Sequence, residues 1–354
     1  MPWVKVRSRL SEIQSKSAFI KYPGSATVAP RLSERVSWSS QNSLWKIRMT
    51  ASLQKPLLIR LLEFLLRPTY PPLSSQTNRQ ILIEIVQLFG FSLVARFLFI
   101  IPTAILSSFV GIDNQIPSIL GQKSIAWALL LIVFLAPLME ELIFRLFLRP
   151  SPLNLVAPLC PILFLNIRLA LSLTEPLLAK LRPIIPGWLL LISLFMICCL
   201  LCASIYPLVK KRFDHSKAEQ FYVKNISYIF YLSSIIFGLL HIFNFDNFEK
   251  NIYFSLLIAI PYILGGFIFG YVRIVYGFRW AYFLHSFNNA YAFFPFAFMS
   301  LVLGNSNPDS FSKSPFTFQQ VFVILLMMVY FFWSLSWAVS TSWRLLQQAR
   351  HCQG

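Results

Sequence analysis

Two adjacent glutamates, Glu140 and Glu141, interrupt an apolar run that reads LMEELIFR over residues 138–145. Charged side chains are costly at membrane depth, and they mark candidate functional sites there. On a helix, Glu141 and Arg145 lie four residues apart with the acid first, which is the favourable order for an ion pair. Adjacent residues point about 100° apart on a helix, so Glu140 shares a face with Phe144 and lacks this partner. Glu140 is therefore a candidate general base, and Glu141 with Arg145 is a candidate structural pair.

Two further apolar segments offer imidazole groups. Phe237 and His241 lie one helical turn apart, and Gly238 between them leaves room for a neighbouring helix to approach closely. His285 and Asn289 also lie one turn apart. Three separate helices would thus bring a carboxylate, two imidazoles and an amide to one interior. These groups can activate a water molecule and stabilise the oxyanion of an amide hydrolysis, so the pattern favours an intramembrane hydrolase.

The helices that must position these residues are predicted by composition. Of 354 residues, 56% are hydrophobic and only 12% are charged, whereas a soluble domain has roughly a quarter charged. A helix needs about 20 apolar residues to cross a bilayer. The sequence has eight apolar windows of this length. The third, near 153–173, is the weakest, because Pro158, Pro161 and Arg168 interrupt it. We expect an all-α polytopic membrane bundle of about eight transmembrane helices, near 81–110, 125–148, 153–173, 187–209, 226–246, 253–272, 280–303 and 321–343.

The net charge of +18 would suggest nucleic acid binding in a soluble protein, but here its placement explains it. With eight spans and a cytoplasmic N-terminus, 24 of the 31 Lys and Arg residues fall on the cytoplasmic side and five outside. Arg96 and Arg168 remain within spans and have no evident partner. This asymmetry is the positive-inside pattern. We therefore expect a multi-pass protein of a plasma, inner or organelle membrane, with both termini cytoplasmic, the lipid bilayer as partner and no nucleic acid.

Residues 1–80 form a basic tail rich in Ser and Arg. It is compatible with a transit peptide, with a disordered cytosolic tail, or with translation starting at Met49. Near 56–67, charged residues at helical spacing oppose a row of leucines, which predicts an interfacial amphipathic helix. We expect residues 81–345 to form the transmembrane domain and 346–354 a cytoplasmic tail.

The three polar elements resemble the EExxxR, FxxxH and HxxxN/B motifs of the CPBP family of intramembrane proteases (CAAX-processing and bacteriocin-processing, or Abi). This family includes the type II CAAX prenyl endopeptidases. The order of the motifs agrees, and so do Gly265, Gly266, Gly270 and the run GFRW at 277–280. The resemblance covers about residues 125–295, and it implies a CAAX prenyl endopeptidase-like core.

The resemblance also implies roles for the residues. Glu140 would activate the attacking water with help from His241, and His285 and Asn289 would hold the oxyanion or position the water. The substrate would be a membrane-anchored protein or peptide, either prenylated or bacteriocin-like. The supporting residues would be Glu141, Arg145 and Phe237.

One departure from the family is the 101-residue distance from Glu140 to His241, which is longer than usual. We expect an inserted helical hairpin at 153–209, whose two extra spans would preserve the directions of the motif helices. The predicted topology also puts His241 at the far end of its span. The site then requires that this span extend through Asn244 towards Phe248.

Metal dependence is open at this point. One carboxylate and two imidazoles make a common catalytic zinc shell, with Glu140, His241 and His285 as ligands. The H-E-x-x-H signature of zinc proteases is absent, and a glutamate-activated water needs no ion. Two other functions also remain open: a membrane scaffold with a protease-like fold and no turnover, and a proton-coupled transporter that uses Glu140 and the histidines as a relay.

Overall fold

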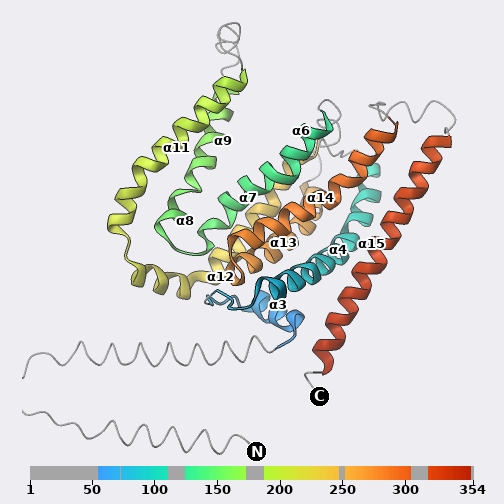
Figure 1. The fold of residues 1–354 in the computed structure, drawn as a ribbon, viewed down its shortest axis with the longest axis horizontal. Helices are drawn as coiled ribbons and strands as arrows, with labels where there is room; N and C mark the ends of the chain where they lie inside the picture. The colour runs from blue at the N-terminus through green and yellow to red at the C-terminus, as the bar shows by residue number, and fades with distance from the viewer. Residues whose placement is uncertain are drawn as a thin grey trace, which may run out of the picture. The chain divides into compact units, whose positions relative to one another are not determined.

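The structure, a computed structural model, describes residues 55–71, 73–110, 124–172, 187–246, 252–303 and 318–351. All regular elements in these ranges are helical (Figure 1). The predicted all-α fold is therefore confirmed. Most of the basic tail and the three long connections between the ranges lie outside the described residues.

The chain enters through a short helix, α3 (Leu57–Leu66), and a long one, α4 (Asn78–Val110). The glutamate motif follows on a segment that changes its winding: α6 (Ile125–Leu129), the π-helix η1 (Leu130–Leu135), α7 (Ala136–Phe144) and the 3-10 turn η2 (Leu146–Leu148). Next come α8 (Pro152–Val156), α9 (Leu159–Ser172) and α11 (Gly187–Arg212). The remaining elements are α12 (His215–Leu240), the 3-10 turn η3 (His241–Asn244), α13 (Ile252–Val275), α14 (Phe278–Leu303) and α15 (Phe318–His351).

All eight predicted windows coincide with helices, but only six of the described helices are both long and apolar enough to cross a membrane. The helix through 153–173 is the exception expected from its prolines, because its apolar stretch, Pro152–Arg168, is too short. Helix α14 is also not among the six, although it has 26 residues. Its arginine, histidine and paired asparagines lower its hydropathy. The expected number of eight spans is thus not confirmed, whereas a multi-pass membrane protein is.

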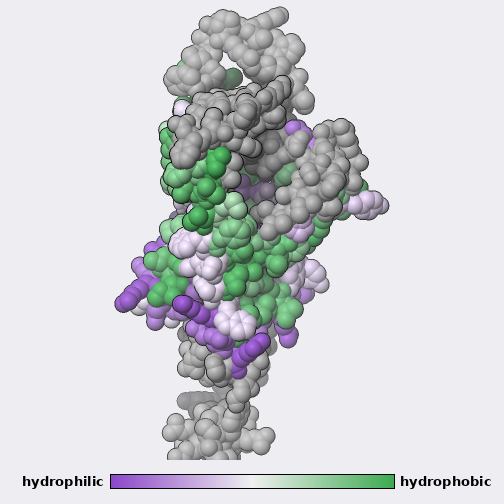
Figure 2. Space-filling model, turned by 90° about the vertical axis from the view of Figure 1, so that its right-hand side faces the viewer, coloured by the Kyte–Doolittle hydropathy of each residue, from purple (hydrophilic) through white to green (hydrophobic). Residues whose placement is uncertain are grey.

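Hydrophobic side chains cover much of the described surface. On the face shown in Figure 2, hydrophobic residues fill the middle, and hydrophilic residues gather towards the lower end. At α11, the mid-helix residues Met196, Leu200 and Leu201 are exposed, while the last turn carries the basic run 210–212. An apolar belt with a charged end is what a bilayer and its aqueous border require.

Helix α13 lies at the centre of the main core and packs against α12, α14 and α4. Its contact with α12 is close at Gly238 and Gly266, because a Cβ at Gly238 would lie 2.6 Å from the backbone nitrogen of Ile263. The chain then turns from α13 into α14 at Gly277, whose φ of 101° is a conformation that favours glycine. Glycines therefore set the approach of α12 to α13 and the turn from α13 into α14, the helix of His285.

The predicted insertion at 153–209 contains α8, α9 and α11. Helices α9 and α11 pack against each other (Figure 1) and share a separate small core of Val156, Cys160, Cys198 and Cys202. The Sγ atoms of Cys160 and Cys199 lie 3.4 Å apart, and both cysteines are free thiols. This hairpin thus has packing of its own, outside the core around α13.

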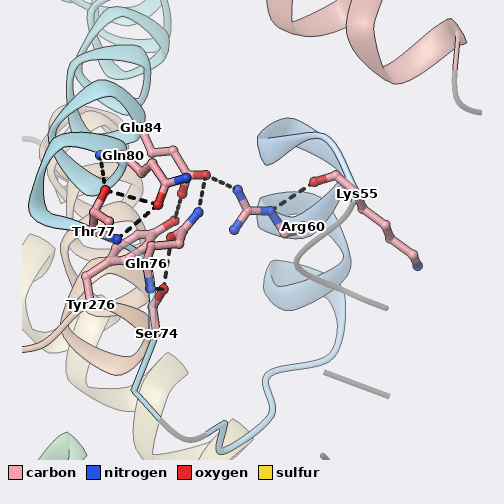
Figure 3. A network of polar contacts seen from close by, with 8 residues as sticks. All are labelled: Lys55, Arg60, Ser74, Gln76, Thr77, Gln80, Glu84 and Tyr276. Atoms are coloured by element: carbon pink, nitrogen blue, oxygen red, sulfur yellow. Dashed lines mark hydrogen bonds and ion pairs between the residues drawn. The ribbon is translucent and has the colours of Figure 1, made fainter. Parts of the chain in front are cut away.

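Helix α3 lies within the range of the predicted amphipathic helix, and Leu57, Leu58 and Leu61 join the main core. Helical spacing places Arg60 with the polar residues of that helix, but its side chain is buried. Its Nη2 pairs with Glu84 Oε1 at 2.5 Å (Figure 3). The buried charge of Arg60 is paired in this position because α4 supplies an acid opposite it.

Candidate active site

Glu140 faces both predicted histidines. Its Oε2 atom lies 3.5 Å from His285 Nε2 and 3.9 Å from His241 Nε2. The Glu140 side chain is 28% exposed, whereas that of Glu141 is fully buried. Residues from α7, the end of α12 and α14 therefore meet at Glu140 Oε2, a buried oxygen that makes no hydrogen bond among the described residues.

His285 is oriented by Glu141. Its Nδ1 lies 2.9 Å from Glu141 Oε1, and both side chains are buried. A carboxylate can only accept a hydrogen bond, so this contact puts the ring proton on Nδ1. The Nε2 lone pair of His285 then points towards Glu140.

His241 is oriented in the same way by its own helix. Its Nδ1 donates to the carbonyl of Phe237 at 2.8 Å, which leaves Nε2 free on the side of Glu140. The α12 helix ends at Leu240, and the 3-10 turn continues only to Asn244. The expected extension towards Phe248 is therefore not needed for the imidazole to meet Glu140.

Arg145 lies behind this site, fully buried at the end of α7. Its Nε is 3.8 Å from Glu141 Oε1, so the predicted local pair forms. The guanidinium carbon of Arg145 also lies 3.6 Å from the centre of the Phe237 ring. The three guanidinium nitrogens make no hydrogen bond within the described residues. Phe237 thus does more than shape a pocket, because its ring face stabilises the buried cation.

Asn289 is placed differently from the role that the motif implies. Its Nδ2 donates to the carbonyl of Ile132 at 3.0 Å, in the π-helix η1. π-helical turns interrupt the regular α-helical ladder and are often found at functional sites. In the described part of the chain no hydrogen bond joins Asn289 to Glu140 or to either histidine. The amide instead ties α14 to the segment that carries the glutamates.

The C-terminal end of α7 is held by side chains that the sequence reasoning did not single out. Four consecutive carbonyls, those of residues 144–147, each accept a hydrogen bond from a neighbouring helix. Ser233 Oγ donates to the carbonyl of Phe144 at 2.5 Å, and Tyr222 Oη donates to that of Phe147 at 2.6 Å. Arg273 donates through Nε to the carbonyl of Arg145 at 3.0 Å and through Nη2 to that of Leu146 at 2.8 Å. Carbonyls at a helix end have no partner within the helix. The sequence signal for these bonds is Arg273, a charge in the last turn of an apolar segment.

The donor types at the site suit a divalent metal. Both histidines offer Nε2 while Nδ1 is held by a carboxylate or a carbonyl, as in metal-binding histidines. Among the described residues, no group of three or more His, Cys, Asp or Glu side chains is arranged as a metal-binding cluster.

Comparison with known families gives one match. Residues 122–291 match the family described as type II CAAX prenyl endopeptidase Rce1-like. This part of the chain is thus an Rce1-like domain of a membrane protease family, and the resemblance drawn from the three motifs is confirmed. No curated protein and no solved structure matches the chain. The match includes all the candidate site residues: Glu140, Glu141, Arg145, Phe237, His241, His285 and Asn289.

Proposed function

We propose that this protein is an intramembrane endopeptidase that hydrolyses a peptide bond near the C-terminus of a prenylated, membrane-anchored protein. The observation that carries the proposal is the position of Glu140 Oε2 between two imidazole Nε2 atoms, 3.5 and 3.9 Å away. The family match supports protease chemistry and a CAAX-type substrate. Apolar helices around the site are suited to a substrate held by a lipid anchor.

In the proposed reaction, Glu140 takes a proton from a water molecule held between its carboxylate and the Nε2 of His241. The resulting hydroxide attacks the scissile carbonyl carbon, and Glu140 then delivers the proton to the leaving amine. His285 takes up a second proton at Nε2 from bulk water before the substrate binds and keeps it through the cycle, and Glu141 stabilises the resulting positive charge, as a buried acid does in a catalytic triad. The Nε2–H of His285 can then donate to the oxyanion. Asn289 contributes by fixing α14 against η1.

We also propose that both termini are cytoplasmic, so that the basic segments 210–212 and 273–279 face the cytoplasm. This orientation follows from the placement of Lys and Arg. It would expose Glu140 to substrates on the cytoplasmic leaflet, where prenylated proteins are anchored. Labelling of single cysteines introduced into these segments would test it.

The experiment that tests the proposed function compares protein termini in membranes carrying the wild type, Glu140→Gln or Glu219→Gln at matched expression. Glu219 is an exposed glutamate on α12, the helix that leads to His241, so it controls for the loss of one charge. We expect shortened C-termini of prenylated proteins with the wild type and Glu219→Gln, and none with Glu140→Gln.

Identical termini from the wild type and Glu140→Gln would contradict the proposal. If Glu140→Gln also rescued the phenotype of a deletion, the scaffold interpretation would replace it. Loss of proton flux in Glu140→Gln without any change in termini would instead support transport.

A further inference from the structure

Arg96 is a charge that the proposed chemistry does not use. It lies within the first candidate span, Asn78–Phe99, and is half-buried. No acidic side chain among the described residues pairs with it. An unpaired cation in a spanning helix is costly, and such residues usually face an interior or a path used by a ligand.

The face of α4 that carries Arg96 packs against α14, and α4 also packs against α13. Phe89 lies seven residues, or about two turns, before Arg96 and so shares its face. The Phe89 ring packs against Phe287 and Tyr291 of α14, with ring centres 4.7 and 5.5 Å apart. The Arg96 guanidinium lies near Tyr291 and near Tyr262 of α13.

Tyr262 connects this cation to the proposed chemistry. Its ring stacks on the imidazole of His241, with ring centres 4.3 Å apart and planes inclined by 22°. The same phenol lies near both Arg96 and Glu140. A substrate group that passes Glu140 and His241 on this side therefore meets a positive charge and a phenol hydroxyl.

We propose that Arg96, assisted by the hydroxyl of Tyr262, binds the C-terminal carboxylate of the substrate. The proposal rests on the proposed function, because a peptidase acting close to a C-terminus must accommodate that anion. A guanidinium binds a carboxylate through two parallel hydrogen bonds, and the pair is strong where little water competes. Arg96 would thus select free C-termini and, by its distance from the attacking water, set how many residues are released.

The test uses the full-length protein in phosphatidylcholine nanodiscs and two farnesylated peptides of identical sequence. One peptide ends in a free carboxylate and the other in an amide, which removes the charge. Binding and hydrolysis are measured for the wild type, Arg96→Gln, Arg96→Lys and Arg168→Gln. Arg168 is the control because it is an exposed arginine on α9, in the hairpin outside the main core.

We expect the wild type and Arg168→Gln to bind the carboxylate peptide about tenfold or more tightly than the amide. Arg96→Gln should bind both peptides equally, and Arg96→Lys should retain part of the preference, because an ammonium keeps the charge but loses the two-pronged geometry. Equal binding of the two peptides by the wild type, or an unchanged preference in Arg96→Gln, would overturn the subsite.

The two proposals can fail separately. If the wild type cleaves both peptides equally, the peptidase stands and the subsite falls. If it cleaves neither but still prefers the carboxylate peptide through Arg96, the subsite stands and the peptidase falls. Adding phosphatidylglycerol to the nanodiscs gives a third arm. If an anionic lipid occupies Arg96, the preference for the carboxylate peptide is lost only in nanodiscs that contain phosphatidylglycerol. If that preference is absent from nanodiscs with and without phosphatidylglycerol, the result counts against the subsite.

Discussion

Glu140 and Glu141 are neighbours in sequence but have different surroundings. Glu140 is partly exposed and approaches two imidazoles, while Glu141 is fully buried between His285 Nδ1 and Arg145 Nε. Removing one member of a buried charged pair is more costly than replacing both, because it leaves an uncompensated charge in a low dielectric. The fold should therefore depend on Glu141, and turnover on Glu140.

We predict that Glu141→Gln lowers the free energy of unfolding by about 3–5 kcal/mol. The reason is that Arg145 is left buried without its ion-pair partner, against the rings of Phe144, Phe237 and Phe269. Thermal unfolding of the detergent-solubilised protein measures the effect. The double variant Glu141→Gln with Arg145→Met should recover part of the loss, and Glu219→Gln provides the control. Wild-type stability in Glu141→Gln would show that the pair is not needed.

The sequence predicted the local partners of these residues but not the distant ones. The pairing of Glu141 with Arg145 follows from helical spacing, and it forms. The contact between Glu141 and His285 joins residues 144 positions apart, and no periodicity specifies which ring nitrogen faces the acid. Similarly, Asn289 binds Ile132 because η1 is wound as a π-helix, and nothing in its apolar sequence indicates that winding.

At the scale of elements, the site depends on how closely α12 approaches α13. Gly238 lies three residues before His241, at the point where the two helices touch. A Cβ there would lie 2.2 Å from Ile263 Cγ1 and 2.6 Å from the Ile263 backbone nitrogen. The isoleucine side chain can rotate away, but the backbone can move only with its helix. A larger residue at 238 must therefore push the helices apart.

We predict that Gly238→Ala destabilises the protein by about 1–3 kcal/mol and reduces hydrolysis, because it moves His241 away from Glu140. Gly265→Ala is the matched control, since the nearest atom to its Cβ would be Phe269 Cε2 at 3.8 Å. That variant should be tolerated, or slightly stabilised by the better helix propensity of alanine. Thermal midpoints and turnover of both variants decide the matter. Similar losses in the two variants would show that close packing at 238 is not the cause.

At the scale of the whole described region, a polar network joins α3, α4 and the end of α13 (Figure 3). Glu84 Oε1 accepts hydrogen bonds from Arg60 at 2.5 Å and Gln76 at 2.9 Å, and Glu84 Oε2 accepts one from Tyr276. Burial raises the pKa of Tyr276, so its hydroxyl keeps the proton that it donates. A single carboxylate thus holds α3 against two of the long helices.

We predict that Glu84→Gln releases α3, because Arg60 then loses its only acidic partner among the described residues. Limited trypsin digestion measures this release as faster cleavage after the buried Arg60. Glu63→Gln is the control, because the pair of Glu63 with Lys55 is about half exposed and contributes little. Equal cleavage rates in the wild type and Glu84→Gln would show that the apolar side chains of α3 are sufficient to hold it.

Sequence reasoning at this scale gave the fold class correctly but not the number of spans. Apolar windows mark where helices lie, and each window contains one. Whether a helix crosses the bilayer depends also on which neighbours cover its polar side chains. In α14, His285 and Asn288 are buried against other helices, and a hydropathy average cannot register such shielding.

The side-chain bonds to the last carbonyls of α7 have a consequence for water. A helix that stops next to a reaction centre normally needs several solvent molecules to satisfy its end. Here Ser233, Arg273 and Tyr222 take over that task, so the end of α7 can remain dry. The few water molecules that enter from the bilayer border are then not held at the backbone. In the proposed reaction they would remain available to Glu140 as the reactant, in surroundings where water is scarce.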